Sequence, residues 1–308
     1  MSKGLVIKST GSWYYVKDDS GQIIPCKIRG SYRMKGIRAT NPVAVGDNVT
    51  FILNDDESGV ITKIGERKNY IIRRSSNLSR EYQLIAANID QAILMISLIR
   101  PTTHLGFIDR FLVSAEAFRI PVVLVFNKID IYPEAEKLEL KKFMDLYGEI
   151  GYQTMAVSLK TNVNIDKIEE LLGSRVTVIA GNSGVGKSTL MNYLDPELDL
   201  RIGEISGYHK TGQHTTTYAE MFFLKSGAKI VDTPGIKGFG MVDISKDELF
   251  HFFPEIFRYS KDCRFNNCIH VNEPACAVIA AVASGKISES RYLNYLALFE
   301  DMGDKYRK

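Results

Sequence analysis

Short stretches of alternating apolar and polar residues run from residue 1 to about residue 65, with turn residues between them. This pattern is typical of half-buried β-strands. Five short strands suit a small closed barrel, for which an OB-fold is the natural candidate, although an SH3-like barrel would give nearly the same pattern. The predicted strands are Leu5–Lys8, Trp13–Lys17, Ile23–Ile28, Asn48–Leu53 and Gly59–Ile64.

From about residue 85 the pattern changes to continuous apolar runs, which indicate strands buried on both faces. Helix-like segments lie between these runs, and such alternation predicts a doubly wound parallel sheet. The predicted strands are Gln91–Ile99, Val122–Phe126, Met155–Ser158, Val176–Ala180, Met221–Leu224 and Lys229–Val231. The predicted helices are Phe107–Phe118, Glu134–Tyr147, Ile165–Leu172 and Lys187–Leu194.

After about residue 240 the pattern is helical, with predicted helices at Ala277–Ser284 and Ser288–Met302. We therefore expect three domains: an OB-like barrel at 1–68, an α/β domain at 69–240 and a helical module at 241–308. The apolar runs are too short to span a bilayer and the first residues lack the features of a leader, so we expect a cytoplasmic protein without a membrane partner. Nothing in the sequence requires more than a monomer.

The net charge of +3 is small, but basic residues gather in two places. One cluster lies in the middle loop of the predicted barrel, and the other comprises Arg67, Lys68, Arg73, Arg74 and Arg80. Taken alone, such clusters usually form solvated surfaces. If the barrel binds RNA, the first candidates for phosphate contacts are Arg29, Arg33, Lys35 and Arg38.

A phosphate-binding signature, GxxxxGK[ST], occupies residues 181–188 directly after a predicted strand and opens a predicted helix. Its glycines let backbone N–H groups converge on phosphate oxygens, Lys187 supplies positive charge for the β- and γ-phosphates, and Ser188 is a ligand for Mg²⁺. The predicted phosphate-binding residues are Gly181, Asn182, Ser183, Gly184, Val185, Gly186, Lys187, Ser188, Thr189 and, from a later motif, Gly235.

Residues 127–130 match NKxD, the motif that reads guanine in P-loop GTPases, at the end of a predicted strand. The Asp130 carboxylate can accept hydrogen bonds from N1–H and the exocyclic amine of guanine, a donor pair that adenine lacks. Ser158 and Lys160 follow the next strand and resemble the SAK loop that supports the base. The predicted guanine-binding residues are Asn127, Lys128, Ile129, Asp130, Ser158 and Lys160.

Asp232-Thr233-Pro234-Gly235 fits DxxG, in which the aspartate approaches Mg²⁺ and the glycine senses the γ-phosphate. The loop at 212–217 lies where a switch threonine belongs, and Thr215, Thr216 and Thr217 are all candidates. We predict Ser188, Thr216 and Asp232 as the magnesium site.

These motifs occur in a rotated order, because NKxD and the SAK-like loop precede the P-loop and DxxG. The order resembles that of a circularly permuted GTPase, in which the segment after DxxG runs directly into the C-terminal module. We therefore expect contacts between Gly235 and the γ-phosphate to bias the orientation of that module.

Three cysteines and one histidine gather in a short stretch of the C-terminal region: Cys263, Cys268, His270 and Cys276. Three thiolates and an imidazole are enough to close a tetrahedral zinc site, and with all four positions filled by protein the metal would be structural. The alternative is a set of buried thiols and a surface histidine. Cys26 is alone among the predicted barrel strands, and we expect it in the core.

The combination of an OB-like barrel, a permuted GTPase and a Cys-Cys-His-Cys module resembles one family, the bacterial small-subunit-dependent ribosome biogenesis GTPases (RsgA family), over essentially the whole chain. The resemblance implies a Zn²⁺- and Mg²⁺-dependent GTPase that acts late in maturation of the 30S subunit, contacts 16S rRNA and is stimulated by that subunit. The state of the bound GTP or GDP would control association and release.

The residue after DxxG is Ile236, where Ras-like enzymes place a water-orienting glutamine. Isoleucine cannot orient water, so intrinsic hydrolysis should be slow. His214, in the switch loop, is the candidate catalytic residue, consistent with the family's proposed use of a histidine there, although a ribosomal group could act in trans. A slow GTP-dependent scaffold is the second hypothesis, and an ATP-dependent kinase or transporter is disfavoured by NKxD.

Overall fold

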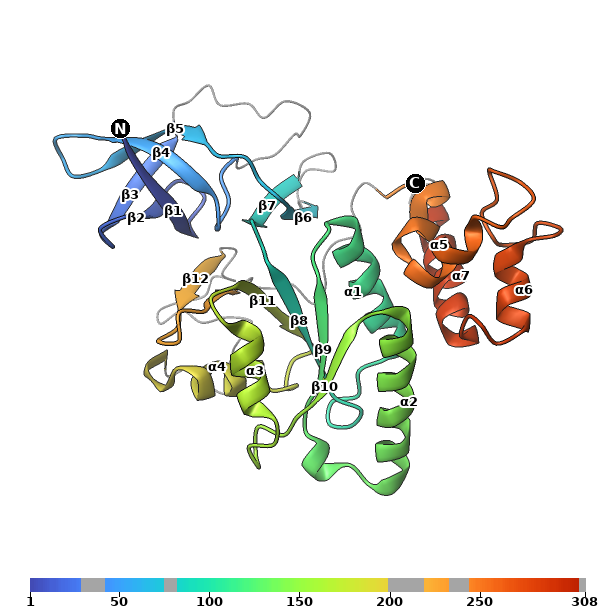
Figure 1. Cartoon of the computed structure of the whole chain (residues 1–308). Helices are drawn as coiled ribbons and strands as arrows, with labels where there is room; N and C mark the ends of the chain where they lie inside the picture. Colours follow the sequence, from blue (N-terminus) through green and yellow to red (C-terminus); the bar gives the residue numbers. More distant parts are fainter. Residues whose placement is uncertain (29–41, 75–81, 199–218, 233–243, 305–308) are drawn as a thin grey trace.

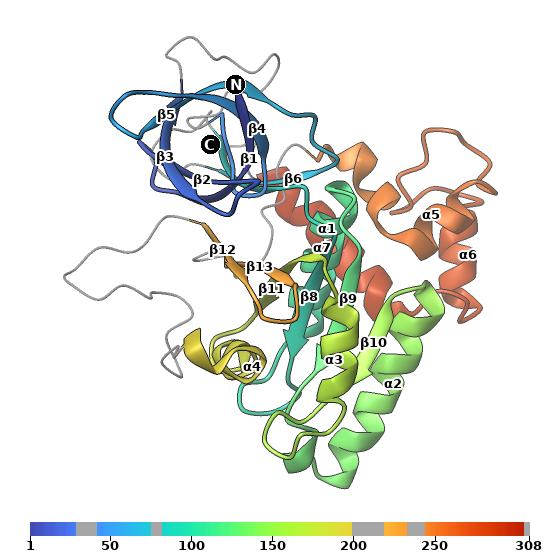
Figure 2. The same cartoon turned by 60° about the vertical axis from the view of Figure 1, so that its left-hand side comes forward.

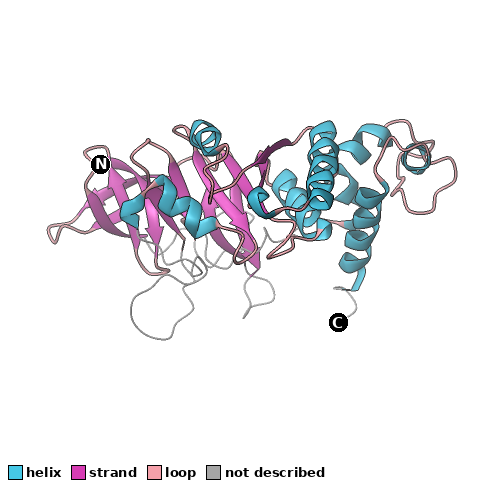
Figure 3. Ribbon diagram, turned by 90° about the horizontal axis from the view of Figure 1, so that it is seen from below, coloured by secondary structure: helices cyan, strands magenta, loops and turns pink. Residues whose placement is uncertain are grey.

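The computed structural model describes residues 1–28, 42–74, 82–198, 219–232 and 244–304. Three regions follow one another along the molecule: a β-barrel, a central α/β domain and a helical module (Figure 1). Viewed from below, the strands of the barrel and the helices of the C-terminal module lie at opposite ends (Figure 3). No helix in the described part of the chain combines the length and apolar character needed to cross a membrane.

The N-terminal strands close into a barrel, seen end-on as a ring in Figure 2. Hydrogen bonds join them in the order β1-β2-β3-β5-β4, and β4 returns to pair with β1. In this Greek-key order β5 lies parallel to β3, as in an OB-fold. Alternate residues such as Val16, Phe51 and Ile61 fill the interior. The strands are β1 (Ser2–Ser9), β2 (Tyr14–Asp18), β3 (Ile23–Ile28), β4 (Asn48–Leu53) and β5 (Gly59–Ile64).

The central domain is a sheet covered by helices on both faces. Its strands follow the order β10-β9-β8-β11-β13-β12, parallel except for β12. They are β8 (Gln91–Ile96), β9 (Val122–Phe126), β10 (Gln153–Ala156), β11 (Val176–Gly181), β12 (Glu220–Phe223) and β13 (Lys229–Asp232). The helices are α1 (Leu105–Ala117), α2 (Glu134–Ile150), α3 (Ile165–Leu172) and α4 (Lys187–Leu194), with short 3-10 turns at η1 (Ile129–Ile131) and η2 (Pro196–Leu198).

The two faces of this sheet belong to different core clusters because neighbouring residues of a strand point to opposite sides. In β8, Leu94 packs with α1 and α2, whereas Ile93 and Met95 pack with α3 and α4. Strand β8 ends at Ile96, three residues earlier than its apolar run predicts. The chain turns there because Ser97 and Thr103 bond to each other through their backbones, with Thr103 N–H donating to Ser97 C=O at 2.8 Å.

A hairpin that the sequence pattern did not predict forms a second sheet, from β6 (Tyr70–Arg74) and β7 (Tyr82–Ala87). Ile71 and Ile85 join the same core as α1, and the ring of Tyr70 lies 6.0 Å from that of Phe118. The basic residues in and around this segment made it resemble a solvated stretch, although its consecutive apolar residues are buried in two hydrophobic clusters.

The C-terminal module consists of short helices around a small core of its own. Leu249, Phe253 and Tyr295 are among its fully buried residues, and Val113 of α1 belongs to the same cluster. The module therefore packs directly on the central domain. Its helices are η3 (Lys246–Phe252), α5 (Pro254–Ser260), α6 (Ala277–Ala283) and α7 (Glu289–Asp304).

The barrel joins the central domain through backbone pairing. Strand β1 pairs with β12 at Lys8 and Glu220, so barrel and central sheet form one eleven-stranded sheet. On the neighbouring side, Ala87 N–H donates to Val45 C=O at 2.8 Å. Gly46 has a φ of +92°, and a Cβ there would lie 2.1 Å from the Ala87 oxygen. Only glycine allows these two segments of the backbone to approach this closely.

Candidate functional site

The P-loop connects β11 to α4 at the carboxyl end of the parallel sheet. Gly186 lies in the left-handed region at φ +111°, and a Cβ there would lie 2.5 Å from the Asn127 side-chain nitrogen. The Lys187 ammonium donates to the carbonyls of Gly181 at 2.7 Å and Asn182 at 2.8 Å. Burial lowers the pKa of Lys187, and the nearby Asp232 carboxylate partly offsets that effect. A positive charge is thus held in the middle of the loop.

Two of the three predicted magnesium ligands lie at this edge, one on a helix and one at the end of a strand. Ser188 is buried in the first turn of α4, and Asp232 is the last residue of β13, which pairs in parallel with β11. The third ligand, Thr216, lies outside the described residues, as do Gly235 and His214. The described part of the site therefore holds a hydroxyl and a carboxylate, the hard oxygen donors that Mg²⁺ prefers.

The NKxD motif is bonded directly to the P-loop. The Asn127 amide donates to Val185 C=O at 2.8 Å, and its side-chain oxygen accepts from Leu159 N–H at 3.3 Å. Lys128, in the left-handed region at φ +67°, donates through its ammonium to Gly184 C=O at 2.7 Å and to Arg100 C=O at 2.5 Å. Two motifs far apart in sequence are thereby held in one rigid arrangement.

The predicted base-reading aspartate is oriented by the SAK-like loop. Ser158, fully buried, donates from its hydroxyl to Asp130 Oδ1 at 2.7 Å and accepts from Thr161 N–H at 3.1 Å. Asp130 and Lys160 are exposed at this edge, and Ile129 is half-buried. The carboxylate is thus fixed through one contact while it faces solvent, the arrangement needed to receive two donors of a base.

These contacts bring the described members of the predicted phosphate, magnesium and base sets together at the carboxyl ends of β9, β10, β11 and β13. Ligands of open α/β sheets bind at this edge. Along this edge lie a phosphate-binding loop, two oxygen donors suited to Mg²⁺ and, farther away, an oriented carboxylate. This arrangement fits a guanine nucleotide with its metal.

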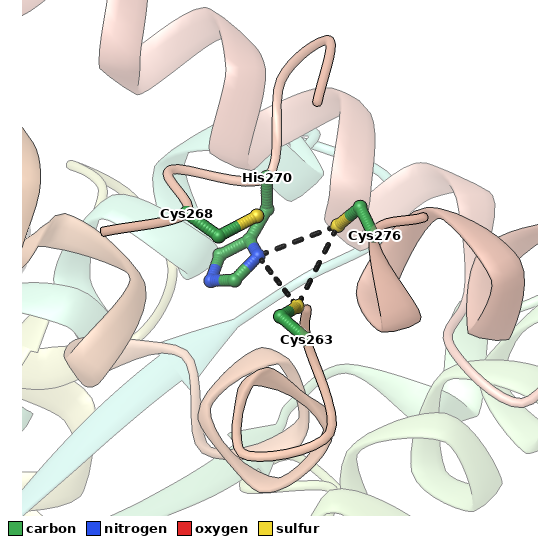
Figure 4. A group of neighbouring side chains, drawn as sticks. All are labelled: Cys263, Cys268, His270 and Cys276. Atoms are coloured by element: carbon green, nitrogen blue, oxygen red, sulfur yellow. Dashed lines mark hydrogen bonds between the residues drawn. The ribbon is translucent and has the colours of Figure 1, made fainter. Parts of the chain in front are cut away.

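The Cys-His cluster is assembled in the C-terminal module (Figure 4). His270 Nδ1 lies 3.5 Å from Cys263 Sγ and 3.4 Å from Cys276 Sγ. The Sγ atoms of Cys263 and Cys276 are 3.9 Å apart. All four ligand atoms, including that of Cys268, lie within 4.8 Å of one another. A tetrahedral zinc site with ordinary bond lengths has S···S edges of about 3.8 Å and S···N edges of about 3.5 Å. The cluster therefore fits zinc.

The loop that carries these ligands is held by polar contacts. The Glu273 carboxylate accepts from the N–H groups of Ile269 at 2.8 Å, Val271 at 2.9 Å and Asn272 at 3.1 Å. The Tyr292 hydroxyl donates to His270 C=O at 2.8 Å. Such contacts orient ligands before a metal arrives. Sequence reasoning missed Glu273 and Tyr292, and the only signal for Glu273 was its place between the ligands.

In the absence of a metal, burial favours the protonated thiols over the thiolates that bind zinc. Burial raises the pKa of Cys268 to about 12 and also raises that of Cys276. Both thiols are therefore protonated at neutral pH unless a divalent cation displaces their protons. Cys26 lies in the barrel core, as its sequence position predicted, with a pKa raised by burial to about 11.

The predicted RNA contacts at Arg29, Arg33, Lys35 and Arg38 lie outside the described residues. Within the second basic cluster, two members have carboxylate partners: Arg67, whose side chain is largely buried, and the exposed Lys68. Arg67 binds both oxygens of the fully buried Asp47 at 2.6 Å, and Lys68 pairs with Asp90. The first pair lies within the barrel region, and the second joins the end of that region to the start of β8.

Comparison with known proteins gives matches along nearly the whole chain. The family model described as RsgA N-terminal domain matches residues 3–61, and the model described as RsgA GTPase matches residues 64–242. A small ribosomal subunit biogenesis GTPase RsgA from Bacteroides fragilis is 54% identical over 306 residues, covering 99% of both chains. The protein of the same name from Christiangramia forsetii is 50% identical over 308 residues, covering 99% of this chain and 98% of its own.

Two solved structures share the fold. YjeQ from Thermotoga maritima has a TM-score of 0.78 and 33% identity, with 98% of each chain covered. YloQ, described as a circularly permuted GTPase, has a TM-score of 0.75 and 31% identity, with 99% of this chain and 96% of its own covered. The rotated motif order deduced from the sequence is thus that of a known fold.

Proposed function

Because the chain belongs to the RsgA family of GTPases, we propose that it acts in late maturation of the small ribosomal subunit, where it binds 16S rRNA and is stimulated by the 30S particle. The observation that carries this proposal is the direct bonding of Asn127 and Lys128 to the P-loop. This bonding supports guanine recognition and phosphate binding in one site. The name shared by its relatives, small ribosomal subunit biogenesis GTPase, supports the ribosomal role.

In the proposed site, Asp130 accepts the two guanine donors, and the P-loop N–H groups with Lys187 hold the phosphates. Ser188, Asp232 and Thr216 would hold Mg²⁺, which when bound would supply positive charge to the phosphates. Hydrolysis requires a water oxygen to bond to the γ-phosphorus while the bond to the β–γ bridging oxygen breaks, which yields GDP and phosphate. We assign His214 to orient that water, since Ile236 cannot.

The C-terminal module is proposed to hold one structural Zn²⁺ through Cys263, Cys268, His270 and Cys276. Four protein ligands leave no open position for a substrate, so the metal would supply stability and not catalysis. The edge distances of the cluster support this assignment. We propose domain limits of 1–68, 69–240 and 241–308. Family-model limits at 61, 64 and 242 support them.

The barrel is proposed to contact rRNA phosphates through Arg29, Arg33, Lys35 and Arg38, with the nucleotide state controlling association and release. Phosphate contacts release counterions, so affinity should fall steeply with salt. We propose that the protein acts as a cytoplasmic monomer, with GTP and GDP as its nucleotides.

The test is GTP hydrolysis by the purified protein with and without purified 30S subunits at two salt concentrations. Strong stimulation that fades at high salt supports the proposal. A lack of stimulation at salt where binding to subunits is demonstrated would favour the second candidate, a slow GTP-dependent scaffold, which Ile236 supports. His214→Ala should lose the stimulated rate, and full stimulation in that variant would end the assignment of His214. Competition by ATP would contradict the base assignment.

A further inference from the structure

Helix α1 is shared between two hydrophobic cores. Ile108, Phe111 and Leu112 pack in the core of the central sheet, whereas Val113 belongs to the core of the C-terminal module. Figure 1 shows α1 between the sheet and helix α7, which it contacts. A displacement of α1 would therefore disturb both cores, because packed interiors tolerate little change in shape.

A buried arginine joins α1 to the module. Arg291 of α7 has 1% of its surface exposed, and its Nη1 donates to Asp109 Oδ1 of α1 at 2.6 Å. Its Nε and Nη2 donate to the two oxygens of Glu255 in α5 at 2.7 and 3.1 Å. Asp109 also accepts from the Tyr147 hydroxyl of α2 at 2.8 Å and from the Asn294 amide of α7. Four helices thus meet at one network of charges.

The N-terminal end of α1, which carries Asp109, also adjoins the nucleotide site. The loop at 97–104 leads into α1, and Asp109 lies only one turn beyond the start of the helix. In that loop, Arg100 C=O accepts from the Lys128 ammonium, and Leu98 N–H donates to the Tyr132 hydroxyl at 2.8 Å. The same hydroxyl donates to Asn127 C=O at 2.8 Å. The NKxD motif is thus bonded to the loop whose helix carries Asp109.

We propose that Asp109 and Arg291 are positioning residues of the nucleotide site: by fixing α1, they hold the 97–104 loop against Lys128 and Asn127. Nucleotide binding and docking of the C-terminal module then stabilise each other, and thermodynamic linkage makes the effect equal in both directions. The inference rests on guanine-nucleotide binding at the proposed site and is independent of rRNA binding.

The test compares Asp109→Asn with Asp301→Asn. The first substitution removes the charge that Arg291 faces and keeps the size of the side chain. The second removes the carboxylate of the exposed pair between Arg110 and Asp301, which joins the same two helices. We expect Asp109→Asn to release fluorescent GDP about 3- to 30-fold faster, whereas Asp301→Asn stays within about twofold of the wild type. Thermal unfolding and zinc content, measured in parallel, identify folded protein.

A folded Asp109→Asn protein with faster hydrogen exchange in α7 but unchanged GDP release would overturn the inference. A reciprocal measurement needs no variant: GDP should slow hydrogen exchange of the wild-type amides in α7. Equal exchange with and without GDP would also overturn it, even if Asp109→Asn does not fold. A wild-type protein that binds no GDP would instead overturn the nucleotide site, so the two failures are distinguishable.

Discussion

The central domain meets its two neighbours through different chemistry. At the barrel junction, backbone groups bond across the boundary, as in the pair between Val45 and Ala87, and β1 continues the sheet beyond β12. At the module junction, within the described residues, the contact is between helices, and its polar centre is the Arg291 side chain with two carboxylates. One junction is made mainly by the main chain and the other by a few side chains.

The charge balance differs as well. At the barrel junction, Lys8 of β1 faces the single carboxylate of Glu220 in β12, so the pair is neutral. At the module, Arg291 faces both Asp109 and Glu255, which leaves an excess of negative charge. Although burial acts to lower the pKa of Arg291, these carboxylates raise it above its ordinary value. We therefore expect the barrel junction to be sensitive to backbone geometry and the module junction to charge.

The largest expected effect follows removal of the proposed zinc. A chelator should unfold the C-terminal module and leave the barrel folded, because structural zinc sites contribute on the order of 10 kcal/mol in isolated modules. Hydrogen exchange in α6 and α7, compared with that in β1–β5, measures the difference. Cys276→Ala should lose zinc, whereas Cys26→Ala, at the buried barrel cysteine, should retain it. Unchanged protection of α6 after verified metal loss would contradict a structural role.

Next in size is the loss of the buried arginine. Arg291→Met leaves two buried carboxylates without their partner, and we expect the free energy of unfolding to fall by about 3–5 kcal/mol. Arg110→Met removes the exposed pair with Asp301 and should cost less than about 1 kcal/mol. Denaturant unfolding measures both. Similar costs for the two variants would show that burial of the network contributes little.

The barrel junction should respond to a single added methyl group. Gly46→Ala places a Cβ against the Ala87 oxygen and forces alanine to φ +92°, so we expect a loss of about 2 kcal/mol or more. Gly21→Ala is the matched control, because its φ is +91° but the nearest atom to its Cβ, from Lys17, is 4.0 Å away. Equal losses in chemical denaturation would mean that backbone strain, and not crowding at the junction, sets the effect.

The smallest effect concerns pH. Burial raises the pKa of Glu116, on α1 near the module, even though the Tyr152 hydroxyl and the charge of Arg291 oppose the shift. The folded state therefore binds this proton more tightly than the unfolded state, and the ionised carboxylate destabilises the fold as pH rises through its folded pKa. Glu116→Gln should be more stable than the wild type at pH well above that pKa. The gain should shrink as pH falls towards the ordinary value of 4.5.

Urea unfolding at several pH values measures this difference. Glu134→Gln, exposed on α2, serves as the control for loss of one negative charge. A gain for Glu116→Gln that is independent of pH would contradict the role of burial.

The hydrophobic pattern predicted the bounds of those helices and strands that begin and end at signals in their own sequence. The observed β3, β4 and β5 have the predicted bounds, as do α3 and α4. Strand β1 is longer than predicted, at Ser2–Ser9, because it pairs with β2, β4 and β12. The residues of β1 do not indicate which strands pair with it, so their alternating pattern alone predicts too short a strand.

The predicted site residues within the described chain lie where their motifs place them, since each motif follows a strand of the same parallel sheet. Arg291 could not be predicted in the same way. An arginine in an amphipathic helix usually faces solvent, and its burial here depends on Asp109, 182 positions earlier in the chain. The hairpin at β6 and β7 was not predicted for a similar reason. Its basic residues suggest a solvated segment, and the burial of its apolar residues depends on packing against α1, which is distant in sequence.

Closure of the barrel also bears on aggregation. Open edges of a sheet invite pairing with another molecule, and the eleven-stranded sheet would have two. One end curls into the barrel, where β4 pairs back onto β1, so among the described strands β10 is the terminal strand of this sheet. That strand spans four residues and begins with the exposed Gln153. Closure of the barrel therefore removes one end of the sheet at which another molecule could add a strand.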